Sequence, residues 1–243
     1  MSKRYWIILL SFIIMHLSLS FVTLPLLLRF GSFESESALL GTAVFITFTI
    51  GFFVILALTV TANRDEEFTR NKADIPDTIL WSFLGIFMVY IAQIVAGLIQ
   101  MYVFGIEPGS ENTEQLVGFA TAVPLLIIVF SVFVPIMEEI VFRKIIFGSL
   151  FKRYGFWIAA LLSGVIFAIV HMDFKHLLVY LLGGIVLAYL YVKTKRIIVP
   201  IIAHVGINSF VMIVQVIFGE QIQNYLDRVE NMQVIFYLFG GLF

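Results

Sequence analysis

Long apolar runs are the feature that most constrains how this chain can fold. A helix needs about 20 apolar residues to cross a hydrocarbon core about 30 Å thick. Four runs are long enough, at residues 5–28, 39–62, 78–104 and 116–137. Hydrophobic residues make up 61% of the chain and charged residues 13%, whereas a soluble domain has about 25% charged residues. The sequence therefore predicts an all-α fold, a polytopic bundle of transmembrane helices.

The second half of the chain has shorter apolar runs that polar residues interrupt. They cover residues 145–151, 156–170, 177–192 and 197–218, and a last run covers residues 234–243. As a helix the last run would be about 15 Å long, half of a hydrocarbon core. We expect it either to lie in the interface or to end a longer membrane helix. In total we expect seven to eight spans.

Basic residues fall before the first run and in every second connection. They are Lys3, Arg4, Arg64, Arg70, Lys72, Lys152, Arg153, Lys193, Lys195 and Arg196. The connections at residues 31–38 and 105–115 contain no Lys or Arg. Because short basic loops stay in the cytoplasm, we expect a cytoplasmic N-terminus. The net charge of −1 and the lack of a basic block indicate no nucleic-acid partner, and the lack of cysteine excludes disulfides and thiolate metal sites.

One charged stretch interrupts the apolar pattern, with Glu138, Glu139 and Arg143 within six positions. An ionised group at bilayer depth costs about 2.5 to 3.5 kcal/mol on the lower estimates, so such groups pair, face a cavity or carry function. Glu139 and Arg143 are four residues apart and can pair on one helix face, whereas Glu138 is turned about 100° away. Glu138 is therefore the free carboxylate. The alternative is a buried ion network that only fixes helix packing.

A histidine in the next apolar run is predicted to lie level with Glu138. If residues 152–154 form a turn, Glu138 lies about 21 Å along one helix and His171 about 25 Å along the next. Phe167 lies one helical turn before His171 and can pack against its ring. A lone membrane histidine is usually a packing residue, but the matched depth favours a shared site.

His204 and Asn208 are the third group of polar residues in the predicted site, after the charged stretch and His171. They are four residues apart on the last long run, shortly after Pro200, and so point to one side of that helix. Counting from Arg196 places His204 only about 12 Å deep. The sequence therefore predicts a polar pair here but does not predict that it reaches the depth of His171.

Together these three motifs resemble a known family. Their order and spacing are Glu138-Glu139-x-x-x-Arg143, Phe167-x-x-x-His171 and His204-x-x-x-Asn208. They resemble the motifs of the CPBP intramembrane proteases, the family of CAAX prenyl endopeptidases and bacteriocin-processing (Abi) proteins. The resemblance covers about residues 116–218.

The resemblance implies hydrolysis of a peptide bond inside the membrane. The residues that match Glu138 and His171 would activate a water, those that match His204 and Asn208 would stabilise the oxyanion, and Arg143 would orient Glu139. Residues 1–115 would be scaffold helices, 116–218 the catalytic membrane core and 219–243 a tail. We expect a multi-pass protein of a bacterial plasma membrane, with membrane lipids and a peptide or lipopeptide substrate as partners; the oligomeric state stays open.

A metal cofactor and two non-proteolytic functions stay open at this stage. Glu138, His171 and His204 make an acceptable zinc ligand set with water in the fourth position, although the chain has no His-Glu-x-x-His motif. A scaffold or immunity protein that sequesters a toxin peptide could use the same polar cluster. A proton-coupled transporter is less well supported because the chain shows no internal repeat.

Overall fold

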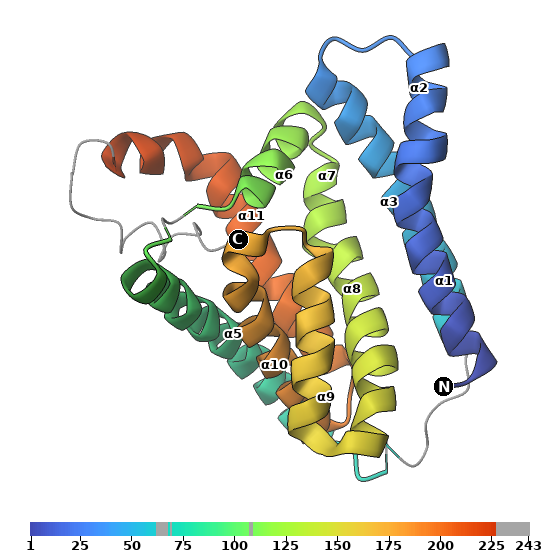
Figure 1. Cartoon of the computed structure of the whole chain (residues 1–243), viewed down its shortest axis with the longest axis vertical. Helices are drawn as coiled ribbons and strands as arrows, with labels where there is room; N and C mark the ends of the chain where they lie inside the picture. Colours follow the sequence, from blue (N-terminus) through green and yellow to red (C-terminus); the bar gives the residue numbers. More distant parts are fainter. Residues whose placement is uncertain (62–67, 69, 107–108, 227–243) are drawn as a thin grey trace.

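Helices form all the regular structure in the part of the chain that the structure describes (Figure 1). The computed structural model describes residues 1–61, 68, 70–106 and 109–226. The predicted apolar run at residues 234–243 and the basic residue Arg64 lie outside these ranges. The all-α prediction is confirmed.

The N-terminal helices form a hairpin along one side of the molecule (Figure 1). Its elements are α1 (Lys3–Ser18), the short π-helix η1 (Leu19–Thr23), α2 (Leu24–Phe30) and α3 (Glu36–Val60). The side chains of Ser2 and Ser35 accept a hydrogen bond from the first turns of α1 and α3 and so fix where each helix begins. Gly51 lets the two helices approach, because a Cβ there would lie 2.2 Å from the Met15 sulfur.

A second group of helices packs around α5 (Ile75–Phe104). Asp74 caps its N-terminus, and Gly105 ends it in the left-handed conformation that glycine adopts most easily. Its partners are α10 (Leu177–Thr194) and α11 (Ile198–Leu226). Their shared core is built from aliphatic residues on all three helices, Val89, Leu187, Leu190, Val199, Ala203 and Ile207.

Between these groups lies a long helix that carries the charged stretch. Its segments are α7 (Leu126–Ile128), η2 (Val129–Phe133), α8 (Val134–Glu138), η3 (Glu139–Phe147) and the start of α9 (Gly148–Val170). Two of them, η2 and η3, are π-helical, with a wider turn than an α-helix. Gly155 has a φ of 75° and turns the chain, so that the rest of α9 returns alongside (Figure 1).

The prediction of one span over residues 116–137 is wrong. Residues up to Ala122 belong to a separate short helix, α6 (Glu111–Ala122), and Val123 leaves the helical conformation. The cause is Pro124, because proline disfavours the helical conformation of the residue before it. The membrane helix that carries Glu138 therefore begins at Leu126 and not at residue 116.

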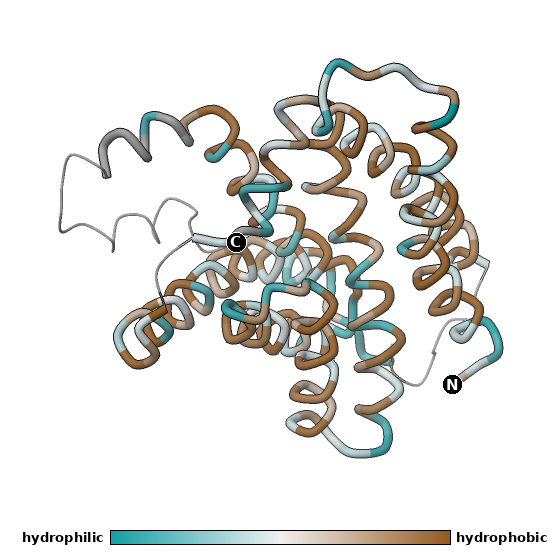
Figure 2. Tube along the Cα trace, turned by 45° about the horizontal axis from the view of Figure 1, so that its top comes forward, coloured by the Kyte–Doolittle hydropathy of each residue, from teal (hydrophilic) through white to brown (hydrophobic). Residues whose placement is uncertain are grey.

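Five helices in the described residues are long and apolar enough to cross a membrane. They are Lys3–Phe30, Glu36–Val60, Ile75–Phe104, Phe174–Thr194 and Ile198–Gly219. The two helices that join at Gly155 lie among them (Figure 1), so the arrangement is roughly compatible with the expected seven to eight spans. Apolar residues dominate the helices (Figure 2), and many large ones, such as Trp6, Phe87 and Trp157, are exposed on their outer faces. The protein is an integral membrane protein.

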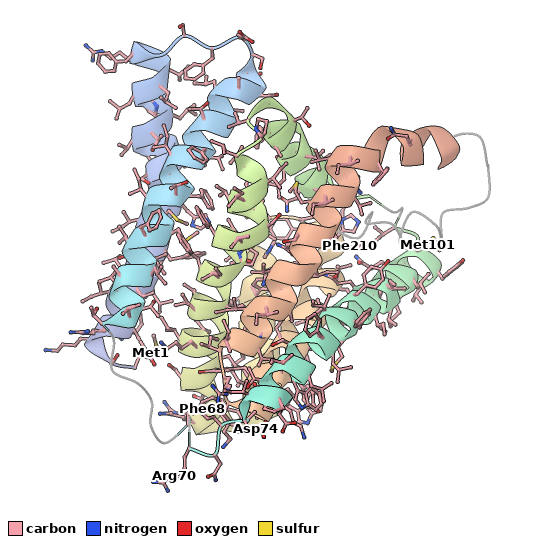
Figure 3. All side chains as sticks on the ribbon, turned by 180° about the vertical axis from the view of Figure 1, so that it is seen from behind. Met1, Phe68, Arg70, Asp74, Met101 and Phe210 are labelled. Carbon is pink, nitrogen blue, oxygen red and sulfur yellow. The ribbon has the colours of Figure 1, made fainter. Side chains whose placement is uncertain are left out.

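The basic connections gather at one end of the bundle. The Ala73 backbone N–H donates to the Thr194 carbonyl at 2.9 Å, and Arg196 Nε donates to the Ala73 carbonyl at 2.6 Å. The ring of Phe68 contacts that of Phe151, which directly precedes the basic connection at Lys152 and Arg153. Figure 3 shows Met1, Phe68, Arg70 and Asp74 toward this same end, away from Met101. The loops on which the orientation was predicted thus share one end.

Candidate active site

The predicted pair between Glu139 and Arg143 is present in the structure. Arg143 Nε lies 3.2 Å from Glu139 Oε2, and both side chains are almost fully buried. The guanidinium also lies 4.4 Å from the centre of the Phe167 ring, a cation–π contact. Phe167 therefore contacts the charged pair as well as the histidine one turn later.

Glu138 lies between two imidazole rings. Its Oε1 is 3.8 Å from His171 Nε2, and its Oε2 is 3.8 Å from His204 Nε2. The expectation that Glu138 and His171 share one depth is confirmed. Both separations exceed a direct hydrogen bond, and each is short enough for one bridging water.

His204 reaches the same depth because its preceding loop is sunk into the protein. Thr194 and Val199 on either side of that loop are fully buried, whereas Lys152 and Arg153 in the other turn are exposed. The depth of His171 was counted from an exposed turn, whereas the depth of His204 was counted from a buried one. The count from Arg196 therefore gave too small a depth for His204.

Both histidines point Nε2 toward Glu138 because their Nδ1 atoms are engaged elsewhere. His171 Nδ1 lies 2.8 Å from the Phe167 carbonyl oxygen, which only accepts, so Nδ1 carries the proton. His204 Nδ1 lies 2.8 Å from Glu139 Oε1 and donates to that carboxylate. Glu139 thus contacts both Arg143 and His204, a role for His204 that the sequence did not predict.

These side chains line one end of a cavity of about 270 Å³. Glu138, His171, His204 and Asn208 all face it, so the structure brings together every residue predicted to be catalytic. The rest of the wall is largely apolar and comes from helices of both halves of the chain; it includes Leu19, Phe48, Leu116, Phe119, Phe130 and Met212. The polar groups of the site therefore share a cavity whose wall is otherwise largely apolar.

Three residues of the cavity wall were missed by the sequence analysis: Gln93 on α5, Asn112 on α6 and Tyr180 on α10. The Tyr180 ring stacks on His171, and Asn112 Nδ2 lies 3.4 Å from the Tyr180 hydroxyl. Gln93 could have been noticed as one of two carboxamides, with Gln100, in a long apolar run. An aromatic residue in such a run gives no comparable signal, because lipid-facing and site-facing positions look alike.

The metal-ligand alternative was tested against the arrangement of the side chains. Two imidazole nitrogens and one carboxylate have the right chemistry for zinc. Among the residues that the structure describes, however, no group of three or more His, Asp or Glu side chains is arranged to hold a metal ion. Glu138, His171 and His204 as placed here are therefore not a fitted metal site.

Comparison with known proteins agrees with the family that the motifs indicate. A family profile described as type II CAAX prenyl endopeptidase Rce1-like matches residues 120–210, which contain all three motifs. The chain is 43% identical over 250 residues to YdiL, a predicted membrane peptidase of Bacillus subtilis (strain 168), with both chains covered in full. The chain belongs to the CPBP family of membrane proteases.

A second CPBP relative matches over part of the chain. It is the membrane-embedded CAAX protease MroQ of Staphylococcus aureus (strain USA300), 34% identical over 164 residues, which cover 65% of this chain and 66% of MroQ. No solved structure matches the chain. Peptidase family membership thus comes from the sequence relatives, and the arrangement of the site comes from this structure.

Proposed function

We propose that the protein is an intramembrane endopeptidase in which Glu138 and His171 activate a water molecule. The observation that carries this proposal is the position of Glu138, whose two oxygens each face an imidazole Nε2 at 3.8 Å. Both gaps have room for a bridging water, and the two carboxylate oxygens and the unprotonated His171 Nε2 all accept hydrogen bonds. A water molecule supplies two hydrogens and places its oxygen beside a carboxylate base.

The reaction begins when this water attacks the carbonyl carbon of the scissile peptide bond. Glu138 takes one proton from the water while the new C–O bond forms, and the carbonyl oxygen becomes an oxyanion. When the C–N bond breaks, Glu138 returns that proton to the leaving nitrogen. The products are a carboxylic acid, which keeps the second proton of the water, and an amine, with no net change in Glu138.

His204 and Asn208 stabilise the oxyanion in this proposal. Since His204 Nδ1 donates to Glu139, Nε2 can donate only when the ring is an imidazolium. That cation would balance the charge of Glu138, because Arg143 already balances the charge of Glu139. Asn208 lies one turn further along α11 and faces the same cavity, and its amide N–H would be the second donor.

The apolar part of the cavity wall favours a substrate that is small or embedded in the membrane. Apolar side chains from α3, α6 and η2 line it, and they would bury an apolar side chain or an acyl or prenyl group equally well. A peptide and a lipopeptide are both compatible with this wall. The substrate class is therefore a membrane-associated peptide, and lipidation is a variable for experiment.

The basic end of the bundle supports a cytoplasmic N-terminus and residence in a bacterial plasma membrane. The connections that carry Lys3, Arg70, Lys152 and Arg196 share that end, and basic loops are retained in the cytoplasm.

The test is cleavage by the purified protein in proteoliposomes. The probes are quenched-fluorescent decapeptides of randomised sequence, with and without a farnesyl or palmitoyl group on a cysteine, each assayed with and without a chelator. We expect cleavage that survives the chelator and falls at least about a thousandfold in Glu138→Gln and His171→Ala. Glu114→Gln, at an exposed glutamate of α6, is the matched control and should retain activity.

The outcomes separate the competing functions. Loss of cleavage on chelation would replace the water-only reaction with a metal-dependent one at the same residues. Wild-type activity in both site variants would contradict the peptidase proposal. A protein that cleaves no probe, but whose biological activity survives both substitutions, would be a scaffold or an immunity protein.

A further inference from the structure

A carboxamide on α5 lies in the cavity wall without a role in the chemistry described above. Gln93 is 6% exposed, and it lines the cavity. Its side-chain oxygen has no hydrogen-bond partner in the described part of the chain. Buried polar atoms are rarely left unpaired. Because this oxygen is itself buried, it meets a partner in the cavity only when the side-chain amide turns toward it.

The position of Gln93 relates it to the catalytic end of the cavity. A Cβ atom at Gly183 would lie 3.8 Å from Gln93 Nε2, so the bare backbone of Gly183 faces the carboxamide. Tyr180 lies three residues earlier on the same face of α10, and its ring stacks on His171. Gln93 is therefore about one helical turn away from the ring that contacts His171.

The chemistry of the group limits what it can bind. A carboxamide has one acceptor oxygen and two N–H donors in one plane, the same functional groups as a peptide bond. A lipid tail offers no hydrogen bond, and an ionic group would find no opposite charge on Gln93. A peptide main chain matches the orphaned oxygen with its N–H.

We propose that Gln93 binds the substrate main chain, with its oxygen accepting an N–H close to the bond that is cleaved. This inference rests on the peptidase function proposed above and adds a positioning residue from a helix outside the three motifs. Gln93 would fix the register of an extended peptide along the cavity, while Glu138 performs the proton transfers.

The first test compares wild-type protein with Gln93→Met, which keeps the length of the side chain and removes its polar atoms. The probe is a decapeptide chosen from the randomised set because wild-type protein cleaves it, with the cleaved bond mapped by mass spectrometry. We expect KM to rise about three- to tenfold, the effect of one neutral hydrogen bond, with kcat changed less. An unchanged KM overturns the inference and leaves the peptidase function intact.

The second test removes the donor from the substrate. N-methylation is scanned over the amide nitrogens on both sides of the cleaved bond. At one position, methylation should weaken cleavage by wild-type protein by the same factor as the Gln93→Met substitution does with the unmethylated peptide. At that position, methylation should not weaken cleavage by the Gln93→Met variant any further. If the two losses multiply at every position, Gln93 acts only through packing and the inference is wrong.

Gln100 provides the matched control on the same helix. It is also buried and its side-chain oxygen is also unpaired among the described residues, but it donates its side-chain N–H to the Lys175 carbonyl and does not line the cavity. Gln100→Met should lower the unfolding temperature and leave KM unchanged. If Gln93→Met does not fold, Gln93→Asn, which withdraws the same amide by one carbon, should show the rise in KM. If wild-type protein cleaves no peptide, the proposed function and this inference both fail.

Discussion

The ring of Tyr180 stacks on the imidazole of His171, with the ring centres 4.2 Å apart and the planes 29° from parallel. On another side of the imidazole the ring of Phe167 makes an edge contact at 4.5 Å. His171 is thus held between two aromatic rings and anchored at Nδ1 by the Phe167 carbonyl. These three contacts leave Nε2 directed at Glu138.

Loss of the Tyr180 ring should lower kcat more than it raises KM. We expect Tyr180→Leu to reduce kcat about tenfold, because aromatic stacking contributes about 0.5–1.5 kcal/mol beyond burial and holds the imidazole in its working orientation. Tyr180→Phe keeps the stacked ring and loses the hydroxyl contacts with Asn112 and Ser110, so it should stay within about threefold of wild type. Steady-state kinetics with the decapeptide probe measure both variants; equal losses would show that the hydroxyl, not the ring, positions His171.

The buried pair of Glu139 and Arg143 should show strong non-additivity in stability. Arg143→Met leaves a buried carboxylate without its cation, and we expect a loss of about 3–5 kcal/mol in the free energy of unfolding. Adding Glu139→Gln removes the uncompensated charge and should restore most of that loss. Unfolding in mixed micelles measures both. Losses that simply add would contradict a coupled pair.

Activity should not return in that double variant. Glu139 also accepts from His204 Nδ1, and a neutral glutamine supports an imidazolium less well than a carboxylate does. We therefore expect the restored protein to cleave the probe at least about tenfold more slowly than wild type. Cleavage at the wild-type rate would show that the charge of Glu139 serves packing alone.

A side chain at Gly51 should separate α1 from α3. A Cβ there would lie 2.2 Å from the sulfur of Met15, which is itself buried, so Gly51→Ala should destabilise the protein by about 1–3 kcal/mol. Gly118 on α6 has no atom within 4 Å of such a Cβ. Gly118→Ala should therefore be neutral or slightly stabilising in the same thermal unfolding assay; equal effects would contradict a close approach at Gly51.

The orientation in the membrane can be tested with engineered cysteines because the chain has none of its own. Lys3→Cys lies at the start of α1 and Glu34→Cys lies between α2 and α3, and both positions are exposed. In intact cells a membrane-impermeant maleimide should label the second variant and not the first. The opposite labelling pattern would place the N-terminus outside.

Much of the site could be predicted from spacing, because neighbours four residues apart on a helix are fixed by local geometry. That explains why Glu139 pairs with Arg143 and why Phe167 packs on His171. The depth of His204 could not be predicted, since the burial of the preceding loop depends on its contacts with Ala73. These contacts join distant parts of the sequence.

The fold shows the same division between local and non-local information. The break before Pro124 was available from the sequence, because proline restricts the residue that precedes it. The contribution of Gln93 and Tyr180 to the cavity could not be predicted from the sequence, because it depends on which face of α5 and of α10 turns inward. Only tertiary packing decides that orientation.

The two adjacent glutamates differ in environment because the helix widens between them: α8 ends at Glu138 and the π-helix η3 begins at Glu139. Within this segment Arg143, four residues further on, lies beside Glu139. Related proteins can therefore exchange apolar residues in this segment, but a single inserted or deleted residue would separate the pair while leaving Glu138 in place. The length of η3, more than its composition, should be what natural variation preserves.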